Sequence, residues 1–158
     1  MRRPFIEKLT ELAERDDKIV FIIGDVGFSF CEEFIRKYPK QFKNVGASEQ
    51  KMINFAVGLA SVGFKPMVYT MSNFILLRPH EQVRNNVCYG NTNVKLFGVK
   101  GSAAYAFLGY SHNLAEGEEE SIIKNWPNLN HHKPETEEEI KEQMEVEYQR
   151  KGPAYFSI

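Results

Sequence analysis

The spacing of hydrophobic residues changes along the chain between a helical period and short continuous runs. Helical spacing and capping residues predict helices at residues 4–15, 31–38, 48–62, 78–89, 118–124 and 136–150. Apolar runs between turn residues predict strands at residues 18–25, 65–71, 93–99 and 154–158, and an extended piece at residues 42–46. Strands separated by helices pair in parallel through right-handed crossovers. We therefore predict an α/β fold whose doubly wound, mainly parallel sheet carries helices on both faces.

In an open parallel sheet, functional residues gather in the loops beyond the carboxyl ends of the strands. Three predicted loops lie there, at residues 25–29, 71–77 and 100–114. The start of the helix predicted at residues 48–62 should face the same edge, because an extended piece runs into it. We expect Glu49, Phe74 and His112 to meet in one crevice at this edge.

Glu49 stands at the head of a helix that is rich in apolar residues and is expected to be largely buried. The amide groups of the first helical turn favour a carboxylate there, whereas apolar neighbours disfavour its charge. Such a group is set up to share or exchange a proton. The alternative is a structural acid that the helix dipole stabilises by about 0.3–1 kcal/mol.

Length, composition, net charge and cysteine count exclude several classes of protein. A chain of 158 residues with 42% hydrophobic content can build one core, so we expect a single domain, residues 1–158. A net charge of −1 with scattered Lys and Arg argues against nucleic acid as a partner. The start of the chain reaches charge too soon for a secretory signal, and no apolar run is long enough to span a bilayer. Cys31 and Cys88 suggest neither a disulfide framework nor a metal site, which fits the cytoplasm.

Two motifs occur in a defined order. The first is NVGASEQ at residues 44–50, with Gly58-Leu59-Ala60 behind it, and the second is MSNF at residues 71–74 followed by RPHEQVR at residues 78–84. With these motifs the chain resembles the pyrimidine-binding domain of the transketolase family, which includes transketolase and deoxyxylulose-phosphate synthase. The resemblance runs from about residue 18 to the C-terminus. It implies a thiamine diphosphate-binding fold and the use of that cofactor.

The resemblance implies roles for three of these residues. The family's Glu at the position of Glu49 bonds a ring nitrogen of the cofactor's aminopyrimidine, whose imino form then removes the proton from the thiazolium carbon. The matching aromatic at Phe74 stacks on the aminopyrimidine, although core packing is the ordinary role of a Phe. Met71 falls where relatives commonly carry another aromatic residue, so it gives the cofactor a softer wall.

Other polar residues leave alternatives open. His112 matches a His that borders the substrate in relatives, where it bonds a sugar oxygen or carries a proton; the alternative is a His facing solvent. Asp25 is either a cofactor-binding residue or a turn former, and we favour the turn. His131 and His132 are expected at the surface, and the acids at 116–120 in a solvated helix start. Thr136 and Glu139 have the spacing of a capping box, in which the two residues exchange bonds with free amides.

Two departures from the family concern the substrate. Leu108 stands where relatives active on sugar phosphates usually have an acid, and Lys100 stands near the place of a His. The loop between them is apolar and aromatic. Sugar hydroxyl groups need polar partners, since buried groups left unpaired are costly. The departures therefore argue against the usual pentose-phosphate substrates.

The family's other domains have no counterpart in the sequence. In relatives a separate domain holds the diphosphate and Mg²⁺ with a Gly-Asp-Gly motif and a distant Asn; this motif and the usual C-terminal domain are absent here. We expect one component of a split enzyme that works with a diphosphate-binding subunit in a homo- or hetero-oligomer. The expected reaction transfers a two-carbon or acyl unit between small carbonyl compounds.

Two further classes of protein fit part of the sequence. A non-catalytic scaffold or regulatory protein of the same fold is favoured by Leu108, Lys100 and Met71, and opposed by Glu49 and Phe74 in their motifs. An unrelated nucleotide-binding module is disfavoured, because no glycine-rich phosphate loop follows the first strand.

Overall fold

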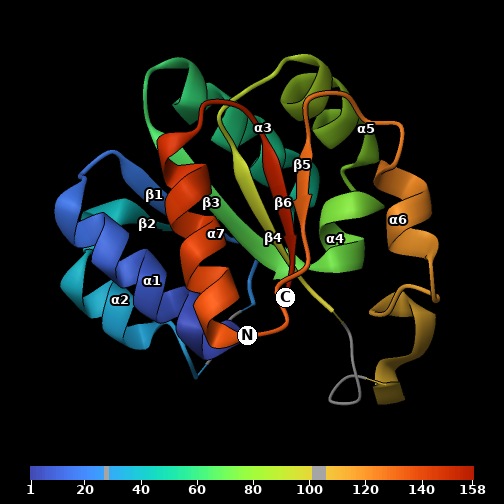
Figure 1. The fold of residues 1–158 in the computed structure, drawn as a ribbon, viewed down its shortest axis with the longest axis horizontal. Helices are drawn as coiled ribbons and strands as arrows, with labels where there is room; N and C mark the ends of the chain where they lie inside the picture. Colours follow the sequence, from blue (N-terminus) through green and yellow to red (C-terminus); the bar gives the residue numbers. More distant parts are fainter. Residues whose placement is uncertain (27–28, 101–105) are drawn as a thin grey trace.

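A computed structural model describes residues 1–26, 29–100 and 106–158 of the chain. Its core is a parallel sheet of six strands in the order β2-β1-β3-β4-β6-β5 (Figure 1). The strands are β1 (Ile19–Ile23), β2 (Phe42–Asn44), β3 (Lys65–Met71), β4 (Lys95–Val99), β5 (Asn130–His132) and β6 (Ala154–Ser157). This confirms the doubly wound α/β fold expected from the sequence.

Helices cover both faces of the sheet (Figure 1). One face packs against α1 (Arg2–Arg15), α2 (Glu32–Lys37) and α7 (Glu137–Gln149). The other packs against α3 (Glu49–Ser61), α4 (Ser72–Leu76), the π-helical segment η2 (Val83–Tyr89) and α6 (Glu118–Ile123). Strand β1 is apolar throughout because alternate residues face the two layers: Phe21 belongs to the first core and Ile22 to the second. Three short elements complete the set in the described residues: the 3-10 turn η1 (Pro39–Gln41), α5 (His80–Gln82) and the 3-10 segment η3 (Ala106–Ser111).

The expected position of His131 and His132 was wrong. Both lie in β5, which pairs in parallel with β6, and both side chains are half-buried. A three-residue strand has too few positions to show an alternating pattern, so its pairing comes from the rest of the sheet.

The helical predictions also need correction. Helix α3 is buried on one face only, at Glu49, Met52, Ile53 and Ala56, whereas Phe55 is 36% and Val62 70% exposed. An amphipathic stripe, rather than full burial, is what its spacing allows. The expected loop at residues 71–77 contains α4, and the helix expected at 78–89 is divided into α5 and η2. Glu119 of α6 is buried, not solvated.

Helix α7 begins with a cap close to the predicted one. The Thr136 hydroxyl accepts a hydrogen bond from the Glu139 amide at 3.1 Å, but the Glu139 carboxylate accepts from the amide of Glu135 and not from that of Thr136. The hydrogen bond from the Glu139 amide to the Thr136 side chain is therefore present. The reciprocal bond of a capping box is replaced by one to the amide of Glu135, one residue before Thr136.

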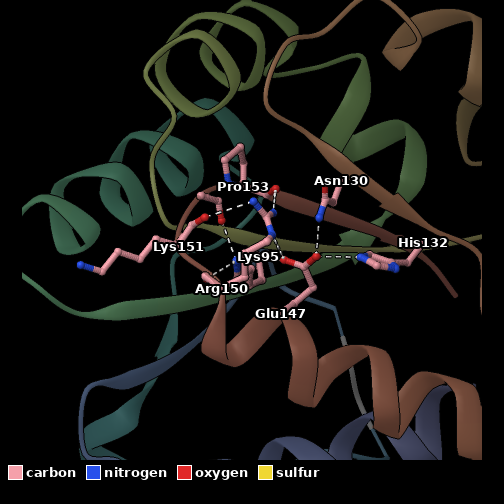
Figure 2. Close-up of polar contacts among 8 residues, drawn as sticks. Lys95, Asn130, His132, Glu147, Arg150, Lys151 and Pro153 are labelled. Carbon is pink, nitrogen blue, oxygen red and sulfur yellow. Dashed lines mark hydrogen bonds and ion pairs between the residues drawn. The ribbon is translucent and has the colours of Figure 1, made fainter.

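Figure 2 shows a buried polar cluster that joins α7 to β4 and β5. Glu147 lies at its centre, and its carboxylate oxygens accept hydrogen bonds from four side chains: Lys95 at 3.2 Å, Arg150 at 2.8 Å, Asn130 at 2.8 Å and His132 at 2.9 Å. The Lys95 ammonium also donates to the carbonyl of Gly152 at 2.6 Å.

Burial and charge act in opposite directions within this cluster. Burial lowers the pKa of Lys95 to about 8. Burial acts to raise the pKa of Glu147, but His132, Asn130 and the nearby cations outweigh it and hold that pKa at about 2. Glu147 is therefore an ionised carboxylate at neutral pH, held in place by its donors.

Candidate active site

A cavity of about 270 Å³ lies at the carboxyl edge of the sheet. Its walls come from the segment after β1, the ends of β3 and β4, helix α4 and the 3-10 segment η3 (Ala106–Ser111) with the residue after it. The lining residues are Arg2, Asp25, Val26, Tyr69, Thr70, Met71, Phe74, Val99, Leu108 and His112. This is where the loops of a doubly wound sheet are expected to form a site.

Phe74 and His112 face each other in this cavity. Phe74, on α4, is 7% exposed, and its ring centroid lies 5.0 Å from that of His112 with 63° between the planes. The Asn73 side-chain amide donates to the Ser111 carbonyl at 2.7 Å, which ties α4 to the segment that carries His112. The Ser111 hydroxyl lies 2.8 Å from Nδ1 of His112. Two anchors therefore orient the imidazole.

Glu49 is the first residue of α3 and is 7% exposed. Its Oε1 accepts a hydrogen bond from Nη1 of Arg78 at 2.6 Å, and the Arg78 guanidinium carbon lies 3.7 Å from the centre of the Phe74 ring. Glu49 is not itself in the cavity wall, but Arg78 connects it to Phe74, which is. The structure thus places Phe74 and His112 in the cavity wall, whereas Glu49 lies outside the wall and is linked to Phe74 through Arg78.

Two residues at this corner were missed from the sequence. Arg78 is the first residue of the RPHEQVR segment of the second motif, but nothing in that segment indicates a role for its side chain. Its side chain is 47% exposed, and no local spacing rule says that an exposed arginine will turn back onto a phenylalanine four residues earlier. Tyr69 lines the cavity two residues before Met71, and the strand period, which places both on the same face of β3, could have found it.

Asp25 and Met71 both line the cavity. Asp25 has φ +57° and exchanges hydrogen bonds with Asn44: its amide donates to the Asn44 Oδ1 at 3.1 Å, and the Asn44 amide group donates to the Asp25 carboxylate at 3.3 Å. Asp25 thus forms a turn at the cavity wall. Met71 is 7% exposed and ends β3. The loops predicted at residues 25–29 and 100–114 lie partly outside the described residues, at 27–28 and 101–105.

A second cavity of about 340 Å³ adjoins the first. Ser72, Lys100 and Asn113 line it, and each directly follows a residue that lines the first cavity. Lys100 and Leu108, the two departures from the family pattern, therefore lie in different cavities. The described residues contain no group of three or more His, Cys, Asp or Glu side chains arranged to hold a metal ion.

Glu119 lines the second cavity and is 6% exposed. Burial acts to raise the pKa of Glu119, but the side chains of His131, Ser157 and Tyr155 lower it below its usual value. The Tyr155 hydroxyl donates to that of Ser72 at 3.0 Å. Ser72 and Glu119 thus give the second cavity polar walls, which the sequence did not predict because Glu119 was expected in a solvated helix start.

Comparison with known proteins gives a consistent result. A family model described as the transketolase pyrimidine-binding domain matches residues 1–158. The chain is 31% identical over 154 residues to a subunit of the apulose-4-phosphate transketolase of Actinobacillus succinogenes, covering 97% of this chain and 49% of that protein. It is also 31% identical over 150 residues to 1-deoxy-D-xylulose-5-phosphate synthase of Oleidesulfovibrio alaskensis, covering 94% of this chain and 23% of the synthase.

Solved structures agree with the sequence relatives. A structure described as a split-gene transketolase in an inactive beta4 tetramer superposes with a TM-score of 0.86 and 28% identity, covering 99% of this chain and 49% of that one. The chain therefore spans about half the length of these two transketolase relatives. Within the described part of the chain, no helix has the length and apolar character needed to cross a membrane.

Proposed function

We propose a function that proceeds from one premise: the chain belongs to the family of transketolase pyrimidine-binding domains. The family implies the use of thiamine diphosphate. We propose that this chain supplies the pyrimidine-binding half of a split transketolase-like enzyme, which transfers a two-carbon or acyl unit between carbonyl compounds. The observation that carries the proposal is the buried Glu49 at the head of α3, within reach of the same corner as Phe74.

The residues at this corner fit one half of the cofactor. An aminopyrimidine ring needs a carboxyl group held away from water and a flat apolar surface, and Glu49 and Phe74 supply them. Bound thiamine diphosphate supplies a nucleophilic carbon for the carbonyl substrate. Glu49 shares a proton with the ring nitrogen, while Phe74, Met71 and Tyr69 orient the ring and exclude water. Asp25 borders the cofactor, and His112 contacts the substrate.

We assign the diphosphate and Mg²⁺ to a partner subunit. The sequence has no Gly-Asp-Gly motif to hold them. Relatives named as single subunits of a transketolase, and a split-gene transketolase whose beta4 tetramer is described as inactive, support an enzyme that needs a second polypeptide. The assembly is an oligomer with a diphosphate-binding subunit. Its place is the cytoplasm, since a chain with two cysteines needs no oxidising compartment.

The test uses this chain purified together with a partner subunit that carries the Gly-Asp-Gly motif. Glu49→Gln should retain thiamine diphosphate in the presence of Mg²⁺ but lose about 100-fold or more in turnover, because the carboxyl group no longer shares its proton. Glu137→Gln is the matched control, since Glu137 is also the first residue of a helix but is exposed. Unchanged turnover in Glu49→Gln would remove Glu49 from the mechanism.

A second candidate is a scaffold or regulator that has lost catalysis. Leu108 in the cavity wall, in place of an acid, favours it. In that case the wild-type complex should show no turnover of its own, while the chain still changes the activity or assembly of its partner. The same purified complex therefore separates the two candidates.

A further inference from the structure

Arg78 makes two contacts at once at the proposed cofactor corner. Its planar guanidinium lies 3.7 Å over the centre of the Phe74 ring and donates a hydrogen bond of 2.6 Å to Glu49. These are the two contacts that the proposed function assigns to the aminopyrimidine: a flat group on Phe74 and an N–H directed at Glu49. Arg78 thus reproduces the interactions of the ring with a side chain of the chain itself.

The arginine and a pyrimidine ring cannot hold these contacts together. Phe74 and Glu49 are each 7% exposed; Phe74 also lines the cavity, whereas Glu49 does not. The Phe74 ring also meets His112 in an edge-type contact. A ring that stacks on the face covered by Arg78 must first displace the guanidinium, because stacked groups need the same van der Waals space.

We propose that Arg78 is a placeholder for the aminopyrimidine: it occupies the ring's position in the empty chain and swings away when the ring binds. This inference rests on the proposed function of the Glu49 corner. An empty corner would leave a buried carboxylate without a partner, which is costly. Arg78 supplies that partner, and its side chain is 47% exposed and can move into solvent without disturbing the core.

The exchange also changes the charge beside Glu49. In the empty chain the Glu49 carboxylate faces the guanidinium cation of Arg78. The incoming ligand is a neutral, planar heteroaromatic amine, which accepts and shares a proton instead. Binding of the ring therefore replaces a cation beside the Glu49 carboxyl group with a neutral group that can share a proton with it.

The test titrates this chain with 4-amino-5-hydroxymethyl-2-methylpyrimidine, the pyrimidine half of thiamine, and follows binding by NMR. Arg78→Met should bind this probe about 10-fold more tightly than the wild type, as expected if Arg78 fills the site most of the time. Arg78→Gln should change in the same direction. The matched control is Arg84→Met, because Arg84 also lies over an aromatic ring, Tyr89 at 4.8 Å, but in η2. That variant should bind like the wild type.

A second readout needs no variant of Arg78. The Nε–H resonance of Arg78 in the wild type should shift towards the position of a solvent-exposed arginine as the probe saturates the site. Arg78 variants that bind the probe equally or more weakly, while Glu49→Gln and Phe74→Ala still weaken its binding, would show that Arg78 is no placeholder. Probe binding that is absent, or indifferent to Glu49→Gln and Phe74→Ala in every background, would overturn the pyrimidine site itself.

Discussion

Glu147 is 2% exposed, and donors from β4, β5 and the end of α7 surround its two oxygens. Its neighbour Lys95 is equally deep, at 3% exposed. A buried ion pair contributes modestly as a whole, but removing one partner leaves the other charge uncompensated. The cluster therefore makes each member sensitive to substitution.

We predict that Glu147→Gln lowers the free energy of unfolding by about 3–5 kcal/mol, because the buried Lys95 loses its counter-charge. Urea unfolding of the 158-residue chain measures this. Glu142→Gln is the control on the same helix, where the exposed side chain should change stability by less than about 0.5 kcal/mol. Equal midpoints for the two variants would show that the cluster does not stabilise the fold.

The residues of the candidate site were predictable to different degrees. Glu49 and Phe74 could be placed from sequence because their positions follow from the start of a helix and the end of a strand. Arg78 could not, since the direction of a long exposed side chain depends on which partners the fold brings near it. The prediction that Glu119 is solvated was wrong for a related reason. Its burial depends on His131 of β5, and this strand is too short to be recognised from sequence.

At Gly98, strand β4 lies close to side chains of β6 and α4. A Cβ atom at this position would collide with the Tyr155 hydroxyl and would lie 2.8 Å from the Ser72 hydroxyl oxygen. The two groups are hydrogen-bonded to each other, and Ser72 lines the second cavity. Gly98 thus lets β4, β6 and α4 pack together without a side chain between them.

We predict that Gly98→Ala destabilises the protein by about 1–3 kcal/mol, because overpacking moves Tyr155 or the strand. Gly58→Ala is the contrasting variant: Gly58 lies in α3 with open space around its Cβ position, so helix propensity should stabilise the protein by about 0.5–1 kcal/mol. Thermal unfolding of both variants tests the contrast. Equal stability of Gly98→Ala and the wild type would mean that β4 relaxes freely.

Elements with a long period or a continuous apolar run were found from sequence, as α1, α7, β1 and β3 illustrate. Two short elements were not found, α4 and β5, which span only five and three residues. Such segments take their conformation from the parts already packed around them. The division of the predicted helix at η2 has the same origin: spacing gives the helical face but not a local change of winding.

The fold as a whole should respond to acid in a defined window. The pKa of Glu147 is about 2 in the folded chain, against an ordinary value of 4.5, so the unfolded chain binds more protons between these values. The stabilising contribution of this group is complete above about pH 4.5 and is lost as the pH falls towards 2. Glu145, paired with Lys8 and Arg15, shifts in the same direction but is partly exposed and contributes less.

We predict that the free energy of unfolding falls by about 3 kcal/mol from Glu147 alone between pH 4.5 and pH 2.

In the alkaline range Lys95 determines how the free energy of unfolding changes with pH. Its pKa of about 8 in the folded chain lies below the ordinary 10.5, so the unfolded chain binds more protons and the free energy of unfolding should rise between these values. Urea unfolding across both ranges measures the two slopes. Glu147→Gln should flatten the acidic slope, and parallel curves for variant and wild type would contradict the assignment.

The order of strands has a consequence for how the chain is made. Strand β6 is the last of the six in sequence, yet it lies between β4 and β5. During translation β5 emerges before the strand it pairs with, and β4 keeps an open hydrogen-bonding edge until residues 154–157 leave the ribosome. A nascent chain that stops short of Ala154 therefore presents an unprotected strand edge, the kind of surface on which aggregation begins.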